Sequence, residues 1–290
     1  MKSNGETQLV GIMGWPVAHS LSPVMHNAAF EHLGLNWRYV PLPVREGEVA
    51  VAIRGMVALG FRGVNVTIPH KLAALDEMDR LGLLVEPIGA INTIVVNQKD
   101  RTLEGHNTDY LGFLNDLYAN DVVIGKETHA VILGAGGAAR ACLATLLQAG
   151  ATVAIVNRTL ESAQELAGQM QPYTSRPLTT HGYAELPALA ENATLIVNCT
   201  SVGMWPKVDE SPWPGGVPFP KNAVLYDTVY RPNRTRLMQT AEAVGARAIG
   251  GLGMLVGQGA VAFEMWTGRR APVEVMRAAC EAALQIEVKL

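Results

Sequence analysis

The residues best suited to acid–base chemistry are Lys71 and Asp109. Lys71 ends the segment NVTIPHK (65–71) and Asp109 ends the segment GHNTD (105–109), and both segments lie where apolar runs predict strand ends. A lysine ammonium can donate a proton to an oxygen that gains negative charge, and the neutral amine can take it back. We expect Lys71 to be this proton donor or an electrostatic stabiliser, with Asp109 orienting it. Asp109 could instead simply cap a helix that begins near Tyr110.

Other polar side chains lie at the predicted ends of strands and starts of helices. Ser20 and Ser22 precede a helix, where their hydroxyls could bind a carboxylate with help from the helix N-terminus. Capping of that helix explains Ser22 equally well but does not explain Ser20. Asn65 and Thr67 alternate with apolar residues, and Asn92 opens a strand. Since ligands of open α/β sheets bind at the carboxyl ends of strands, these residues predict a polar pocket in the N-terminal half.

A glycine-rich segment, GAGGAA (134–139), lies between a nearly all-apolar strand (129–134) and a helix that runs to Gly150. Glycines at such a turn let the backbone approach a pyrophosphate, and the helix N-terminus offers free N–H groups. Ala139 replaces the third glycine of the usual pattern, which the pattern permits. The segment predicts a dinucleotide site, and the alternative is an ordinary tight turn between strand and helix.

The end of the next strand bears on which dinucleotide would bind. An NAD site usually has a carboxylate there for the ribose 2′-hydroxyl. This chain has Asn157, Arg158 and Thr159, with no acid. A guanidinium can pair with a 2′-phosphate through charge-assisted hydrogen bonds. The sequence therefore favours NADP over NAD, unless Arg158 merely extends into solvent.

Composition excludes several other classes of protein. Of the 290 residues, 49% are hydrophobic and 17% charged, which is typical of a folded globular chain rather than a disordered one. The net charge of −3 and the lack of a basic cluster argue against a nucleic-acid or anionic-membrane surface. Three cysteines without CxxC spacing predict neither a disulfide scaffold nor a metal site. No signal peptide or membrane-spanning run is found, so we expect a cytoplasmic protein.

Strand-like and helix-like segments alternate along the chain, which predicts an α/β fold with helices packed on mostly parallel strands. The predicted strands are 8–13, 37–44, 63–68, 91–96, 129–134, 151–157, 194–199 and 223–228. The predicted helices are 22–34, with Ser22 as N-cap, 46–59, 71–81, the stretch from the GAGGAA segment to 150, 159–170, 252–266 and 272–288. Five prolines and three glycines make residues 201–221 a long loop. The pattern restarts at residue 129, so a domain boundary is expected near 107–128.

Taken together, the motifs resemble those of the shikimate dehydrogenase family, in the family's order and over essentially the whole chain. They are SLSPxxHN (20–27), NVTIPHK (65–71), INT (91–93), GxNTD (105–109), GAGGAAR (134–140), NRT (157–159), NCTSVGM (198–204), YDTVYRP (226–232) and GLGMLVGQ (251–258). The resemblance implies the reversible NADPH-dependent reduction of 3-dehydroshikimate to shikimate, a step of aromatic amino-acid biosynthesis.

The resemblance also implies roles for particular residues. Ser20 and Ser22 would bind the ring carboxylate. The ring hydroxyls would be held by Asn65, Thr67, Lys71, Asn92, Asp109, Tyr230 and Gln258. The cofactor would contact Gly134, Ala135, Gly136, Gly137, Ala138, Asn157, Arg158, Thr159 and Gly251. Thr228 stands where the family commonly has Met beside the nicotinamide, and Gly257 and Gly259 stand where Ala is usual, which should loosen that helix slightly.

By the same resemblance, residues 1–108 form a substrate-binding domain that is completed by the C-terminal helices, about 252–290. Residues 109–251 form a Rossmann-like NADP-binding domain. Two alternatives remain open: a quinate/shikimate dehydrogenase with relaxed substrate or cofactor use, and a non-catalytic sensor of a shikimate-like ligand. We expect a small-molecule substrate, no metal, no nucleic acid or membrane partner, and a monomer or homodimer.

Overall fold

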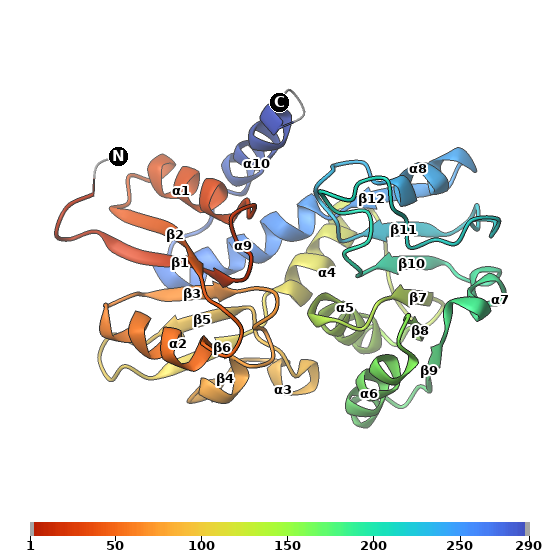
Figure 1. Cartoon of the computed structure of the whole chain (residues 1–290), viewed down its shortest axis with the longest axis horizontal. Coiled ribbons are helices and arrows are strands. Elements are labelled where there is room, and N and C mark those ends of the chain that lie inside the picture. Colours follow the sequence, from red (N-terminus) through yellow and green to blue (C-terminus); the bar gives the residue numbers. More distant parts are fainter. Residues whose placement is uncertain (1–2, 288–290) are drawn as a thin grey trace. The chain divides into compact units, whose positions relative to one another are not determined.

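The computed structural model describes residues 3–287, and Figure 1 shows strands and helices alternating along the chain. The chain forms two compact α/β units. The first comprises the chain up to Gly112 together with the chain from Val256 onward, and the second comprises Phe113–Leu255. The unit boundaries fall inside two helices, α4 (Asp109–Ala119) and α9 (Leu252–Thr267).

The first unit is built on a six-stranded sheet with the order β2-β1-β3-β5-β6-β4. The strands are β1 (Gln8–Gly14), β2 (Trp37–Pro43), β3 (Gly63–Val66), β4 (Arg80–Leu81), β5 (Thr93–Val96) and β6 (Leu103–His106). The ladders β1–β2, β1–β3 and β4–β6 are parallel, whereas β3–β5 and β5–β6 are antiparallel. The sheet is therefore mostly parallel, as the alternation predicted.

Helix α2 (Val49–Ala58) shows how this unit builds its core. Its buried residues Val49, Ile53 and Met56 recur at helical spacing, so one stripe of the helix packs with buried sheet residues such as Met13 and Val64. The other helices of the unit are α1 (Ser22–His32), α3 (Val85–Ile88), α10 (Val273–Glu287) and the short 3-10 helix Leu75–Glu77, and α1 packs against α10.

A second buried cluster in this unit is aromatic. His26 and Phe30 of α1 lie among Tyr39 of β2 and Phe263 and Trp266 of α9, with ring centroids 4.4–6.3 Å apart. The imidazole of His26 is stacked almost parallel on Tyr39, at an interplanar angle of 2°. These rings fix the position of α1, whose first residue is Ser22, one of the two serines predicted to bind substrate.

The second unit contains a fully parallel six-stranded sheet with the order β12-β11-β10-β7-β8-β9. The strands are β7 (His129–Leu133), β8 (Thr152–Val156), β9 (Leu178–His181), β10 (Leu195–Asn198), β11 (Val224–Asp227) and β12 (Arg247–Gly250). This is the doubly wound strand order of dinucleotide-binding sheets. The order reverses between β7 and β10, which is where such sheets bind their ligands.

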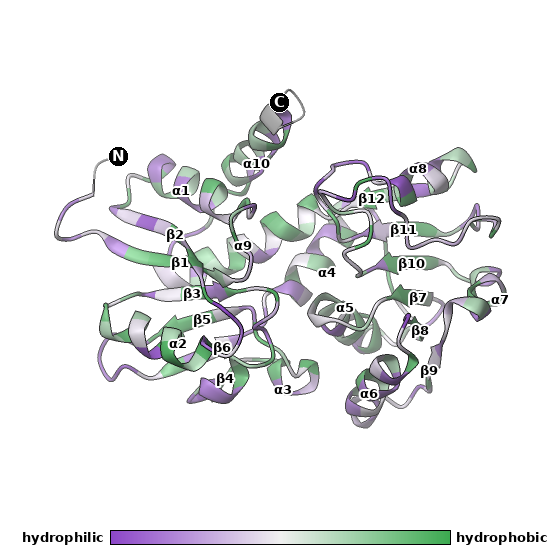
Figure 2. Cartoon of the chain, viewed as in Figure 1, coloured by the Kyte–Doolittle hydropathy of each residue, from purple (hydrophilic) through white to green (hydrophobic). Residues whose placement is uncertain are grey.

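The helices of this unit are α5 (Gly137–Gln148), α6 (Leu160–Met170), α7 (Leu186–Ala190) and α8 (Arg236–Ala243), with short 3-10 helices at Gln171–Tyr173 and Tyr183–Glu185. Figure 2 shows the hydrophobic colouring of the central strands β7, β8 and β10. Nearly every residue of these strands is buried, because parallel sheets are covered on both faces.

The helix predicted over residues 71–81 is wrong. Residues 68–74 form turns, and Leu75–Glu77 is a 3-10 helix. The carbonyl of Lys71 accepts the N–H of Ile91 at 2.9 Å, and Arg80 and Leu81 pair with β6. These long-range hydrogen bonds replace the local ones that a helix would need. Lys71 therefore does not stand at a helix N-terminus.

Two expectations about helix starts are also corrected. Ser22 is the first residue of α1 rather than its N-cap; Leu21 takes that place, and no side chain of the described residues caps the helix. Asp109 is likewise the first residue of α4, and its carboxylate bonds to other side chains. The prediction also omitted β4, β6, β9, β12, α3, α7 and α8. Residues 201–221 contain neither helix nor strand, as expected of a loop.

Candidate active site

Lys71 and Asp109 form an ion pair in the first unit. The ammonium of Lys71 donates a hydrogen bond to Oδ2 of Asp109, and the two side chains are only 14% and 9% exposed. Asp109 is fixed on both sides, since its N–H donates to Oδ1 of Asn107 at 3.1 Å. An ammonium carries three N–H donors, and this pair uses one of them. The pair is the arrangement expected of a held proton donor.

The amide of Asn92 holds the other oxygen of this carboxylate. Its Nδ2 donates to Oδ1 of Asp109 at 2.9 Å and to Oγ1 of Thr108 at 3.0 Å. Its Oδ1 accepts from the N–H of Thr108 at 2.7 Å and from the hydroxyl of Thr93 at 3.0 Å. Both the nitrogen and the oxygen of the buried Asn92 amide thus make hydrogen bonds within the chain, and the amide orients Asp109. Gln258 of α9 is also buried, with Oε1 3.4 Å from Nδ2 of Asn92.

Asn65 is oriented by a similar set of bonds. Its Nδ2 donates to the carbonyl of Asn92 at 3.1 Å and to the hydroxyl of Thr93 at 3.0 Å. Its Oδ1 accepts from the hydroxyl of Tyr39 at 2.7 Å. Because both amide protons are used, the capacity that remains on Asn65 is that of an acceptor. A ligand hydroxyl could donate to it.

Tyr39 is a residue that the sequence reasoning missed. It is 2% exposed, and burial raises its pKa well above the usual value, while a hydrogen bond with the Ser22 side chain lowers it. Its hydroxyl therefore lies between Ser22 and Asn65. Thr93 and Thr108 were also unassigned, although both occur in the INT and GxNTD motifs. Tyr39 sits in an ordinary strand sequence, which gives no local signal.

The remaining residues predicted to bind substrate in this unit are Ser20, Ser22 and Thr67. Ser22 is buried, and Ser20 is half-buried with its Oγ accepting from the N–H of Ser22 at 3.3 Å. Thr67 follows β3 and is half-buried against Gly14; a Cβ at Gly14 would lie 2.3 Å from Cγ2 of Thr67. The first unit therefore connects Ser22, Tyr39, Asn65, Asn92, Asp109 and Lys71 through one chain of hydrogen-bonded groups.

In the second unit, the glycine turn follows β7 at the reversal of strand order. Gly134 has a φ of +104°, which disfavours other residues, and its N–H donates to the carbonyl of Val156 at 2.8 Å. Gly136 is the N-cap of α5, and a Cβ built there would meet no described atom within 4 Å. Ala135, Gly137 and Ala138 are half-buried, and Gly136 is exposed. The turn thus presents an open helix N-terminus, which fits a pyrophosphate.

The end of β8 carries the predicted 2′-phosphate residues. Asn157 donates from Nδ2 to the carbonyl of Thr159 at 2.8 Å, which folds this segment back on itself. Arg158 and Thr159 are exposed. Burial raises the pKa of Tyr183, and the positive charge of Arg158 partly offsets this rise. The guanidinium of Arg158 therefore interacts electrostatically with Tyr183. A cation here, with no acid in the segment, fits a phosphate monoester better than a ribose hydroxyl.

Thr228, Tyr230 and Gly251 come from the loops after β11 and β12. The N–H of Thr228 donates to the carbonyl of Asn198 at 3.0 Å, and the N–H of Gly251 donates to the carbonyl of Val229 at 3.2 Å. A Cβ at Gly251 would lie 2.2 Å from the carbonyl oxygen of Thr228, so only glycine allows this approach. Tyr230 is half-buried in the same loop as Thr228. The structure brings these residues together within the second unit.

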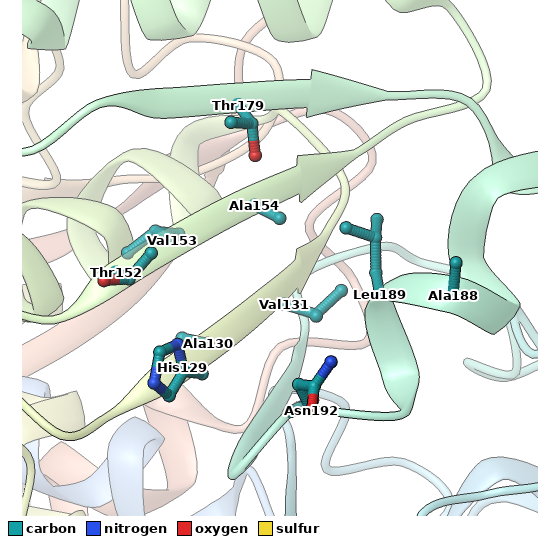
Figure 3. A pocket seen from close by; sticks show the side chains of 11 residues that line it. His129, Ala130, Val131, Thr152, Val153, Ala154, Thr179, Ala188, Leu189 and Asn192 are labelled. Carbon is teal, nitrogen blue, oxygen red and sulfur yellow. The ribbon is translucent and has the colours of Figure 1, made fainter.

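A separate shallow pocket of about 200 Å³ lies on one face of this sheet (Figure 3). Short side chains of β7, β8 and β9, including Val131, Ala154 and Thr179, form its floor, and Leu189 and Asn192 line its edge. His129 and Thr152 place it over the starts of the strands, whereas the glycine turn follows the strand end. None of the predicted site residues lines it.

Within residues 3–287, no group of three or more His, Cys, Asp or Glu side chains could hold a metal ion. None of the helices formed there combines the length and hydropathy needed to span a bilayer.

Three protein-family models match successive parts of the chain. Residues 12–94 match the shikimate dehydrogenase substrate binding domain, residues 119–204 match shikimate / quinate 5-dehydrogenase, and residues 251–281 match the shikimate 5′-dehydrogenase C-terminal domain. The matches follow one another in chain order and together span most of the sequence.

Individual relatives match over nearly their whole length. The chain is 47% identical to a shikimate dehydrogenase (NADP(+)) of Moorella thermoacetica, over 93% of this chain and 91% of the relative. It is 42% identical to one of Methanothermobacter thermautotrophicus, over 97% and 98%. Among solved structures, the shikimate 5-dehydrogenase of Thermus thermophilus in complex with NADP(H) and shikimate aligns with a TM-score of 0.84 and 37% identity, over 96% of this chain and all of that one. With identities of this size over the full length, the chain belongs to the shikimate dehydrogenase family.

Proposed function

We propose that this protein is an NADP-dependent shikimate dehydrogenase that reversibly reduces 3-dehydroshikimate to shikimate, a step on the way to aromatic amino acids. The observation that carries the proposal is the Lys71–Asp109 pair, held by Asn92 in the first unit. The open glycine turn of the second unit supports the cofactor assignment. The relatives named above carry the same activity in their names.

Bound NADPH supplies the hydride that reduces the substrate ketone. The carbonyl oxygen then gains negative charge and needs a proton, which Nζ of Lys71 donates as the C–O⁻ group becomes a hydroxyl. In the oxidative direction the neutral amine takes that hydroxyl proton back. Asp109 keeps the ammonium in place throughout, because Asp109 is itself fixed by two asparagines. Asn107 accepts its backbone N–H, and Asn92 donates to Oδ1 of its carboxylate. Its charge also stabilises the ammonium electrostatically.

Substrate binding is assigned to the chain of polar groups that extends from Ser22 to Gln258. Ser20 and Ser22 would donate to the ring carboxylate near the start of α1. The free acceptor capacity of Asn65 and the hydroxyl of Thr67 would bind ring hydroxyls, together with Asn92, Gln258 and Tyr230. Each of these contacts is part of the proposal.

Cofactor binding is assigned to the segments after β7, β8, β11 and β12. The residues are Gly134, Ala135, Gly136, Gly137, Ala138, Asn157, Arg158, Thr159, Thr228 and Gly251. The free N–H groups at the start of α5 would bind the pyrophosphate, and Arg158 would bind the 2′-phosphate. The proposal also includes a reducing, cytoplasmic location, which is supported by three cysteines that form no disulfide among the described residues, Cys142, Cys199 and Cys280.

The direct test is the absorbance of NADPH formed by the purified protein from shikimate and NADP⁺. We expect steady turnover that depends on both reactants. A protein that binds shikimate but forms no NADPH would be the non-catalytic sensor instead. A quinate/shikimate dehydrogenase would also turn over quinate, and Arg158 favours the NADP-dependent shikimate enzyme over that alternative.

A further inference from the structure

Asp227, the last residue of β11, is a buried carboxylate with three donors from three parts of the second unit. It is 0% exposed. Its Oδ1 accepts from Nδ2 of Asn198 at 2.8 Å and from the N–H of Val229 at 3.1 Å, and its Oδ2 accepts from the hydroxyl of Thr235 at 2.6 Å. No motif reasoning gave this residue a role, although it lies within YDTVYRP.

The bond with Asn198 extends to the glycine turn. Asn198 is the last residue of β10, and its Oδ1 accepts from the N–H of Thr200 at 3.0 Å and from the hydroxyl of Thr200 at 2.7 Å. A Cβ built at Gly134 would lie 3.1 Å from Cγ2 of Thr200. The turn that Asn198 shapes is therefore in contact with the residue that opens the proposed pyrophosphate site.

The bond with the N–H of Val229 acts on a second loop of the site. This loop contains Thr228 and Tyr230, and the carbonyl of Val229 accepts the N–H of Gly251. Since the backbone of Thr228 is packed against Gly251, the position of one determines the position of the other. One carboxylate thus shapes the loops after β10 and β11, and through the second it fixes Gly251.

A buried carboxylate is a costly way to brace a fold. Burial raises the pKa of Asp227, and the hydrogen bonds from Thr235, Val229 and Asn198 oppose this only in part. No cation pairs with this carboxylate among the interactions described, and an apolar residue would avoid the desolvation. Two of its three bonds lead to loops that carry or contact proposed cofactor residues, and the third leads to Thr235, which caps α8.

We propose that Asp227 is a positioning residue for the dinucleotide: through Asn198 and the N–H of Val229 it sets the loops after β10 and β11 around the glycine turn. The inference rests on the proposed function, because it presupposes that NADP binds at the second unit. Asp227 itself touches neither reactant.

The test is Asp227→Asn in the full-length protein, with NADPH binding followed by its fluorescence and with the KM values for NADP⁺ and shikimate measured separately. The amide keeps the shape, but its nitrogen takes the place of one of the two accepting oxygens and faces either the donors of Asn198 and Val229 or the hydroxyl of Thr235. We expect NADPH binding to weaken about tenfold, as loss of one buried hydrogen bond implies. The KM for shikimate should change less than the KM for NADP⁺, by about threefold at most, because Tyr230 is the one residue of these loops that is assigned to the substrate.

Two further variants separate positioning from general stability. Asp116→Asn changes another buried carboxylate of the same unit, which accepts from Tyr226 at 2.6 Å, and it should lower Tm without weakening NADPH binding. Asn198→Asp combined with Asp227→Asn restores the mutual bond of the two side chains but turns the amide nitrogen at position 227 toward the N–H of Val229, so NADPH binding should recover only in part.

A folded Asp227→Asn protein that binds NADPH as tightly as the parent would overturn the proposal. If that variant does not fold, Asn198→Ser takes its place: it breaks the link to Thr200 and leaves Asp227 with Val229 and Thr235. Unchanged NADPH binding by that variant would have the same consequence. Failure of the parent protein itself to bind NADPH would instead contradict the proposed function. The two failures are therefore distinguishable.

Discussion

Asn92 and Asp109 are joined by a 2.9 Å hydrogen bond from the amide of Asn92 to Oδ1 of the carboxylate, whose Oδ2 accepts from Lys71. The amide is itself held by Thr93 and Thr108. Asn92 therefore determines the direction in which Asp109 presents its carboxylate to Lys71. The orientation of the proposed proton donor, Lys71, therefore depends on Asn92, a neutral residue that is hydrogen-bonded to the carboxylate partner of Lys71.

Replacing Asn92 tests this dependence. In Asn92→Ala, Oδ1 of Asp109 loses its buried donor, which costs about 1–3 kcal/mol. We expect kcat to fall at least about tenfold, since about 1.4 kcal/mol of lost orientation corresponds to that factor. Steady-state kinetics and thermal unfolding measure the two effects. Asn97→Ala, at a turn after β5, is the matched control, and equal kinetics of the two variants would contradict the role of Asn92.

Lys71 is expected to carry the proton transfer. Lys71→Ala should lower kcat by roughly 10²–10⁴, the usual contribution of a positioned acid–base group, with a smaller change in the KM for shikimate. Lys99→Ala, at an exposed lysine, should leave both constants unchanged. Turnover of the Lys71 variant within a few-fold of the parent would remove Lys71 from the mechanism.

Arg158 is expected to determine the choice of cofactor. Arg158→Ala removes a charge-assisted contact to the 2′-phosphate, so the KM for NADP⁺ should rise about 10–100-fold while turnover with NAD⁺ is unchanged. Arg234→Ala is a suitable control, because Arg234 is an exposed arginine paired with Glu242. A parallel loss with both cofactors would show that Arg158 does not recognise the phosphate.

His26 is expected to make the protein sensitive to acid. Burial lowers its pKa from 6.5 to about 3, and neither ring nitrogen has a hydrogen-bond partner among the described residues. Below pH 6.5, His26 therefore binds a proton in the unfolded chain, whereas in the folded chain it binds one only near pH 3. Stability is complete above the unfolded pKa and declines as the pH falls, by about 2 kcal/mol at about pH 5.

Denaturant unfolding at several pH values measures this slope. His26→Phe should lose this contribution to the slope between about pH 7 and about pH 5, because phenylalanine cannot take up a proton on unfolding. His32→Phe, at an exposed position of the same helix, should keep it. Identical slopes for the parent and for His26→Phe would mean that His26 does not contribute.

Local patterns predicted the α/β class and most strands, because apolar runs and glycine-bounded turns reflect burial and backbone geometry directly. They failed for residues 71–81, where the hydrogen bond from Ile91 to Lys71 and the pairing of Arg80 with β6 come from distant parts of the chain. The short strands β9 and β12 were also missed. Each is an edge strand with one neighbour, so its sequence shows only a weak hydrophobic pattern.

The candidate site shows the same division. Lys71 and Asp109 were predicted as a pair from residue type and strand-end position, and the structure brings them together. Tyr39 and Asp227 were not, because their importance lies in hydrogen bonds to Asn65 and Asn198, 26 and 29 residues away in sequence. At Gly259, a Cβ would lie 2.3 Å from Cε of Met25, a packing constraint that no sequence pattern reveals.

The most direct measurement of the central claim crosses two substrates with two cofactors. The purified protein is assayed with shikimate or quinate, each with NADP⁺ or NAD⁺, and kcat/KM is compared among the four combinations. We predict that shikimate with NADP⁺ gives the highest value. Turnover of quinate with NAD⁺ at an equal or higher kcat/KM, or no turnover in any combination, would contradict the assignment.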